Sequence, residues 1–221
     1  MPGLLATEVA TLIKASLSAF ENISEIYGDT ANTESLPLSN AESLPPAFHD
    51  VGKHVPTVCE VLQEIRKRVR ERKDDSTCAG MKSIAEECKR KADCVEKLFS
   101  KVIPSDKKME CYRTAVREMG NESRIEDLMK DAMKDIQLLL TIDEEMQLAT
   151  KSYLELLIKS MKEVSAIPQS LQDEGPALGF HNYGSGPQNV NTGSGPQNNN
   201  NDKGIQVNGG TFNNVNPFQP Q

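Results

Sequence analysis

Apolar side chains in the first three quarters of the chain recur at intervals of three and four residues, which is the period of an α-helix. The clearest run spans residues 48–69, where the spacings alternate strictly between three and four. Its members are Phe48, Val51, Val55, Val58, Leu62, Ile65 and Val69. No convincing strand-like alternation occurs before residue 180. The sequence therefore predicts an all-α fold.

The same periodicity marks five or six amphipathic helices, joined mostly by short loops, and such helices form a bundle. The expected helices are residues 3–27, 46–69, 79–102, 105–119, 123–139 and 141–167. A linker rich in Ser, Asn and Pro follows the first helix, at about residues 28–43.

Several residues indicate where these helices start and stop. Pro56 lies inside the apolar stripe of residues 48–69 and disfavours helical geometry at Val55, so we expect a kink or break there. The pair at residues 120–121, Gly-Asn, ends one helix. Ser123 with Glu126, and Thr141 with Glu144, have the spacing of capping boxes that open the next two helices.

The apolar content of the chain divides it into two parts. Hydrophobic residues make up 37% of the whole chain but only 11 of the 54 residues from position 168 onward. We expect a helical domain over residues 1–167 and a disordered tail, rich in Asn, Gln and Gly, over residues 168–221. The net charge of −7 argues against a general nucleic-acid binder.

The tail carries a degenerate repeat of nine residues. Gly-Ser-Gly-Pro-Gln-Asn begins at Gly184 and again at Gly193, and an eroded third copy keeps the register at Gly204 and Gln206. The candidate self-assembly residues are Gly184, Gly186, Gln188, Asn189, Val190, Asn191, Gly193, Gly195, Gln197, Asn198, Asn199, Asn200, Gly204 and Gln206. Stacked copies would align identical amides in ladders, as in cross-β fibrils. The alternative interpretation is a flexible low-complexity linker.

Cysteine and histidine usage indicates no enzyme site. The five cysteines are odd in number and contain no Cys-x-x-Cys pair, so we expect reduced, mostly buried thiols. His49 and His54 lie five residues apart and do not share a helix face. The chain has no Gly-x-Ser-x-Gly and no phosphate-binding loop. We therefore predict no catalytic, cofactor or metal site and no enzymatic activity.

Two segments could meet a membrane. No run of about 20 apolar residues predicts a span, and the N-terminus lacks the basic region of a signal peptide. The first helix is nevertheless the candidate membrane-active helix, through Leu4, Leu5, Val9, Leu12, Ile13, Leu17 and Phe20. The alternative is a permanent core helix. The basic run at residues 66–73 has two interpretations, a solvated helix end or a contact with anionic lipid.

Residues 44–56, 81–104, 112–117 and 124–130 occur in the order expected of the SesA domain, which is found at the N-terminus of fungal STAND proteins and as stand-alone chains. The body resembles this domain over about residues 4–171. The tail is similar to the sigma amyloid motif, whose repeats read like Gly-Ser-Gly-x-Gln-Asn-Asn-Asn. Both copies here carry Pro at the variable position, and Val190 replaces one Asn.

The resemblance implies a function. It implies a cytoplasmic, non-enzymatic effector without cofactors, whose partner is a STAND receptor that carries a NACHT domain and a similar repeat. The receptor would template the tail into a homo-oligomer or fibril. By analogy with related bundles, the effector would then move to the plasma membrane and cause cell death in heterokaryon incompatibility or defence. The alternative is an adaptor or scaffold whose tail assembles without membrane action.

Overall fold

The computed structural model describes residues 3–33, 42–73, 75–120 and 123–171, and all regular secondary structure in these stretches is helical. The all-α prediction is confirmed. The eight helices are α1 (Leu4–Thr33), α2 (Pro46–Gly52), α3 (Val55–Glu71), α4 (Asp75–Val102), α5 (Lys108–Met119), α6 (Ile125–Leu140), α7 (Glu144–Ala149) and α8 (Lys151–Ser165).

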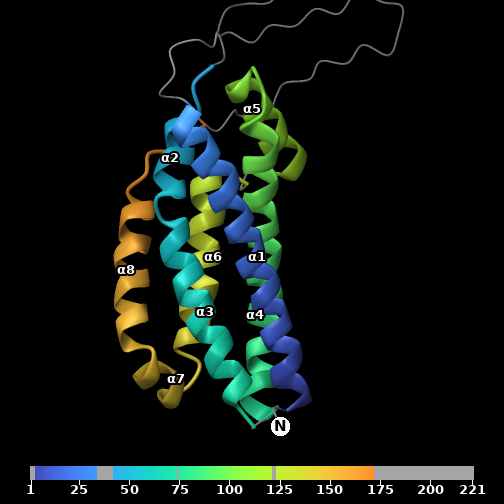
Figure 1. Cartoon of the computed structure of the whole chain (residues 1–221), viewed down its shortest axis with the longest axis vertical. Coiled ribbons are helices and arrows are strands. Elements are labelled where there is room, and N and C mark those ends of the chain that lie inside the picture. The colour runs from blue at the N-terminus through green and yellow to red at the C-terminus, as the bar shows by residue number, and fades with distance from the viewer. Residues whose placement is uncertain (1–2, 34–41, 74, 121–122, 172–221) are drawn as a thin grey trace, which may run out of the picture. The chain divides into compact units, whose positions relative to one another are not determined.

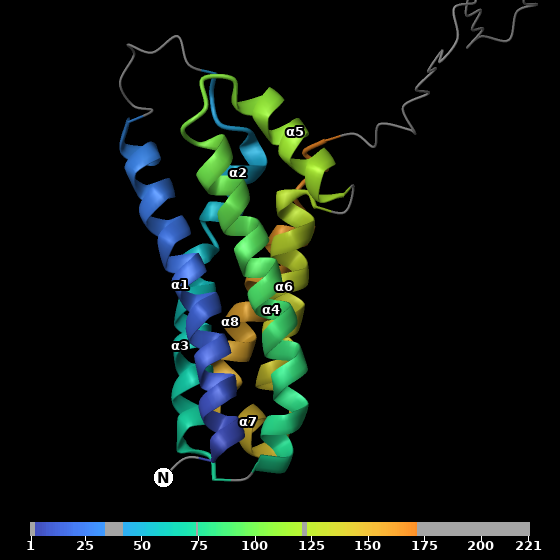
Figure 2. The same ribbon diagram turned by 90° about the vertical axis from the view of Figure 1, so that its right-hand side faces the viewer.

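Four long helices form the centre of the bundle. Helix α1 packs against α3 and α4, and α4 packs against α6 (Figures 1 and 2). Helix α8 lies along α3 and α6 at the outer edge of the bundle. The short helices close the two ends, with α2 and α5 at one end and α7 at the other (Figure 1). The apolar faces of the long helices therefore cover one another.

The predicted break in the long apolar stripe separates α2 from α3. Helix α2 ends at Gly52 and α3 begins at Val55, so that Pro56 lies in the first turn, where its missing N–H costs no hydrogen bond. All seven stripe residues are buried on both sides of the break. A Cβ atom at Gly52 would lie 2.9 Å from the Tyr27 ring, so the small residue lets α2 approach α1.

Edge-to-face aromatic contacts fill the end of the core beside α2 and α5. The Phe48 ring lies 5.1 Å from the Phe99 ring and 5.0 Å from the Tyr112 ring, measured between centroids. Tyr27 adds a third contact, with its centroid 6.3 Å from that of Phe99. Each contact joins different helices, and such pairs add about 0.5–1.5 kcal/mol beyond the apolar area they bury.

The sequence predicted where α5 ends but not how α6 is capped at its start. Helix α5 ends before Gly120 as predicted, and this glycine has a positive φ of 102°, which side chains larger than hydrogen rarely allow. The capping box of Ser123 and Glu126 is wrong: α6 has Arg124 at its N-cap position and no side-chain cap. The Glu126 carboxylate instead accepts hydrogen bonds from Ser170, far along the chain.

The second capping box is also wrong, because the start of α7 uses a neighbouring residue. Asp143 is the N-cap residue, and its carboxylate accepts a hydrogen bond of 2.7 Å from the backbone N–H of Met146. The Thr141 hydroxyl donates to the carbonyl of Gln137 at 2.9 Å and so belongs to the end of α6. The expected single helix over residues 141–167 is divided into α7 and α8 at Thr150.

Candidate functional site

The candidate membrane-active residues of α1 mostly face the core. Val9, Ile13, Leu17 and Phe20 are at most 4% exposed. Leu5 and Leu12 are half-buried, whereas Leu4, at the start of the helix, is 76% exposed. One side of α1 is therefore buried between α3 and α4, and an insertion of this face into lipid requires that α1 leave the bundle.

Polar contacts also tie α1 to α4. The Lys82 ammonium lies 2.9 Å from the Glu8 carboxylate, and the Asn22 amide donates to Glu96 at 2.7 Å. Both pairs are exposed, and each contributes little to stability. Together they favour one relative position of α1 and α4 along their axes. No helix in the described stretches is both long enough and apolar enough to cross a membrane.

The basic run at the end of α3 forms ion pairs rather than a uniform positive surface. The Arg68 guanidinium lies 2.6 Å from Glu64, and the Arg72 guanidinium lies 2.6 Å from Asp143 at the start of α7. A cleft of about 610 Å³ beside them is also lined by Glu144 and Glu145. This mixture of charges favours the structural interpretation of the basic run, with Arg72 joining α3 to α7.

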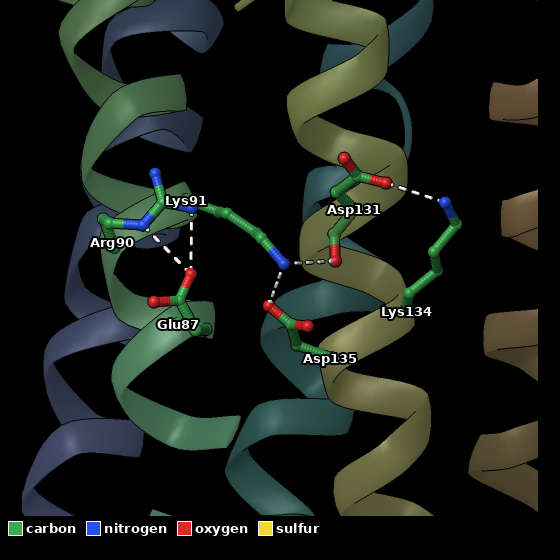
Figure 3. A network of polar contacts seen from close by, with 6 residues as sticks. All are labelled: Glu87, Arg90, Lys91, Asp131, Lys134 and Asp135. Carbon is green, nitrogen blue, oxygen red and sulfur yellow. Dashed lines mark hydrogen bonds and ion pairs between the residues drawn. The ribbon is translucent and has the colours of Figure 1, made fainter. Parts of the chain in front are cut away.

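Sequence reasoning missed an ion pair between α4 and α6. The Lys91 ammonium lies 2.6 Å from the Asp135 carboxylate, and the side chains are only 16% and 11% exposed. Figure 3 shows Lys91 reaching across to α6, where the Asp131 carbonyl also accepts from it at 3.5 Å. Burial raises the pKa of the Asp135 carboxyl, while the Lys91 charge opposes this rise.

A chain of hydrogen bonds holds the end of the described body. Ser170 donates its backbone N–H to the Glu126 carboxylate at 2.8 Å and its hydroxyl at 2.7 Å. A serine hydroxyl has one hydrogen, so the Tyr112 hydroxyl must donate to Ser170 Oγ across their 2.7 Å contact. The Tyr112 oxygen in turn accepts from the N–H of Ile125 at 3.0 Å. Burial raises the pKa of Tyr112 to about 12, so it stays a donor at neutral pH.

We call residues 167–171 the strap. Its last residue is held separately, because the Arg124 guanidinium donates to the Leu171 carbonyl at 3.2 Å. Ile167 and Leu171 are partly buried against the core, whereas Pro168 and Gln169 are exposed. The strap thus binds α5 and the start of α6 mainly through polar contacts. All candidate self-assembly residues of the tail, from Gly184 to Gln206, lie outside the described residues.

The five cysteines, together with His49 and His54, do not come together in one cluster. All five cysteines are free thiols, as predicted; Cys59, Cys78 and Cys88 are buried and the other two are half-buried. His49 contacts the Tyr27 hydroxyl at 3.3 Å, and His54 contacts Glu163 at 3.7 Å. Among the described residues, no three or more His, Cys, Asp and Glu side chains are grouped as a metal site.

A family model described as SesA, the N-terminal domain on NACHT NTPases and P-loop NTPases, matches residues 13–139. The match covers more than half of the chain and includes α3, α4 and most of α1 and α6, and it ends before α7. Neither the curated proteins nor the solved structures contain a match. The chain therefore belongs to the SesA family, and the association of this family with NACHT NTPases supports a role in STAND-related signalling.

Proposed function

We propose that this protein is a non-enzymatic effector of a STAND receptor that contains a NACHT domain, and that its tail receives the signal. One observation carries the proposal: a SesA bundle and a nine-residue repeat occur in the same chain. The family places the bundle among NACHT-associated domains. The repeat supplies a means by which two different chains could recognise each other.

The repeat suits templating because its register is fixed. The Gly-Ser-Gly-Pro units have turn chemistry, and the segments at 188–192 and 197–201 lack Gly and Pro. A receptor that clusters similar repeats would present ordered strands, and an arriving tail would gain backbone and amide ladders without a new nucleation step. The tail alone is too polar to offset the entropy of its own ordering.

The output of the clustered bundles is proposed to be a membrane effect that leads to regulated cell death. The supporting feature is the apolar face of α1, which includes Val9, Ile13, Leu17 and Phe20. Before activation the protein would be cytoplasmic, with this face covered by α3 and α4. Clustering at the plasma membrane would raise the local concentration of α1 and favour an interfacial helix.

A second candidate function is an adaptor or scaffold that assembles through its tail and leaves membranes intact. The burial of the same α1 residues favours it, since they already stabilise the core. The two candidates share the templated tail and differ in what the bundle does. Leakage of liposomes by tail-clustered protein separates them.

The experiment that tests the shared part uses a peptide of residues 175–221. We expect it to form ordered fibrils that bind thioflavin and that seed the full chain. Liquid droplets without ordered fibrils would instead support a scaffold that only condenses, and a peptide that stays monomeric at all concentrations tested would contradict both candidates.

A further inference from the structure

The strap occupies the point where the helical body continues into the tail. Helix α8 ends at Ser165, and Ser170 and Leu171 are then bound back to the N-terminal end of α6. The first repeat begins at Gly184, and only the 12 residues 172–183 separate it from Leu171. Whether the strap is bound or released therefore sets the length of chain between the bundle and the repeats.

We propose that the strap is a latch, which opens while the bundle stays folded and lengthens the tether between the bundle and the repeats. The tether role rests on the proposed function, because it matters only if the tails assemble. Bound, the strap leaves residues 172–183 as the tether, with a reach of at most about 43 Å. Released, it adds residues 167–171 and at most about 18 Å.

The contacts of the strap explain why it can open alone. Beyond the hydrogen bond from the Ile167 N–H to the Val164 carbonyl at the end of α8, it is held by the hydrogen bonds of Ser170 and Leu171 and by only two partly buried apolar side chains, Ile167 and Leu171. When it leaves, water can solvate the Glu126 carboxylate. The Tyr112 hydroxyl keeps its bond from the Ile125 N–H, so the first turn of α6 loses no backbone partner. Segments with few apolar contacts are the ones that open locally.

Assembly of the tails supplies a reason for opening. Strands in a cross-β stack repeat every 4.7–4.8 Å, so a chain that adds two strands occupies about 10 Å of the stack. Each helix with its side chains is about 10 Å wide, and a bundle with helices side by side is at least about 20 Å wide. Bundles attached at intervals smaller than their own width must spread outward, and the longer tether lets them do so.

The sharpest test compares Ser170→Asp with Ser170→Asn in the full chain. The Asp carboxylate would lie next to that of Glu126 and repel it, whereas Asn has the same size, carries no charge and keeps donors. We expect Ser170→Asp to speed amide hydrogen exchange at strap position 170, whose N–H donates to Glu126 in the natural chain, at least tenfold and to leave exchange in α1, α3 and α4 unchanged. Ser170→Asn should stay within about twofold of the natural chain.

A second comparison removes the carboxylate that accepts from Ser170. Glu126→Ala deletes the carboxylate that binds Ser170, and Glu118→Ala is the control, since Glu118 is exposed on α5 and pairs with Lys101 at 2.8 Å. Only Glu126→Ala should release the strap. The latch is contradicted if neither Ser170→Asp nor Glu126→Ala speeds exchange of the strap, or if both speed exchange throughout the bundle, because the strap would then unfold only with the core.

The tether role is measured by seeded growth of the full chain on fibrils of the tail peptide. Deletion of residues 176–180 should slow growth several-fold in the natural chain and less in the Ser170→Asp chain. Equal slowing in both would refute the tether role and leave the latch intact. If the natural chain does not grow on seeds at all, the proposed function and the tether role both fail, whereas the exchange experiment still decides whether the strap opens alone.

Discussion

The Lys91 ammonium of α4 lies 2.6 Å from the Asp135 carboxylate of α6, and both groups are largely withdrawn from water. Burial raises the pKa of Asp135, and the attraction to Lys91 offsets only part of this rise. An ion pair of this kind is costly to break, because the remaining partner is left buried without its counter-charge. It connects two of the four central helices at a defined register.

Asp135→Asn should therefore destabilise the bundle by about 3 kcal/mol, the lower end for a buried pair because both side chains keep some exposure, since the Lys91 charge remains and its counter-charge is gone. Urea unfolding followed by circular dichroism measures the loss. Asp131→Asn is the matched control: its partner Lys134 is half exposed, and the expected change is within about 0.5 kcal/mol. The double variant Lys91→Met with Asp135→Leu removes both charges and should recover most of the stability. Equal effects of the two Asn variants would contradict this view of the pair.

A second prediction compares one substitution in the core and at the surface. Leu62 is fully buried on α3, and Leu148 is 78% exposed on α7. Leu62→Asp places an unpaired charge in the core and should cost at least about 4–5 kcal/mol, enough to unfold many domains. Leu148→Asp should change stability by less than about 0.5 kcal/mol. Thermal melts of both variants check the assigned core, and a folded Leu62→Asp protein would show that assignment to be wrong.

Periodicity predicted the helices well because the spacing of apolar residues, which decides whether they share one helix face, can be read from neighbouring positions alone. The stripe from Phe48 to Val69, its break before Pro56 and the stop at Gly120 all follow from neighbouring residues. The helix limits were less well predicted. Helix α1 continues to Thr33, past the predicted end at residue 27, and α5 begins at Lys108 rather than at residue 105.

The contacts that join distant segments could not be read from the sequence. Glu126 has the spacing of a capping residue, but Ser170 competes for its carboxylate from 44 positions away. Lys91 and Asp135 likewise look like ordinary surface charges on amphipathic helices until α4 and α6 are placed together. The polar groups that fix the register of a bundle therefore depend on the tertiary structure.

A third prediction concerns the thiols. Burial raises the pKa of Cys59 to about 11 and that of Cys88 to about 12, so almost no thiolate forms at neutral pH. Cys94 and Cys111 are half-buried and accessible to reagents. Alkylation of the folded protein followed by mass spectrometry should modify Cys94 and Cys111 first and Cys59 and Cys88 at least tenfold more slowly. Early modification of Cys88 would contradict the packing of α4 against α1.

A fourth prediction separates the membrane effector from the scaffold. Leu4 is exposed, so Leu4→Asp should leave the bundle folded but oppose the entry of α1 into a lipid interface. With tails clustered by fibril seeds, leakage of anionic liposomes should fall several-fold relative to the natural chain. Leu148→Asp, on α7, serves as the control and should leak normally. Identical leakage by all three proteins would exclude α1 as the membrane-active helix.

The most direct test of the central claim is seeded growth of two double variants of the full chain. Asn189→Asp with Asn198→Asp would stack like charges at about 4.8 Å along the fibril, whereas Ser185→Asn with Ser194→Asn changes only turn positions that tolerate Asn. With preformed fibrils of the repeat as seeds, we expect thioflavin growth and amide protection at residues 188–201 to be lost in the Asp variant and retained in the Asn variant. Equal growth of both variants would contradict templating through a stacked repeat.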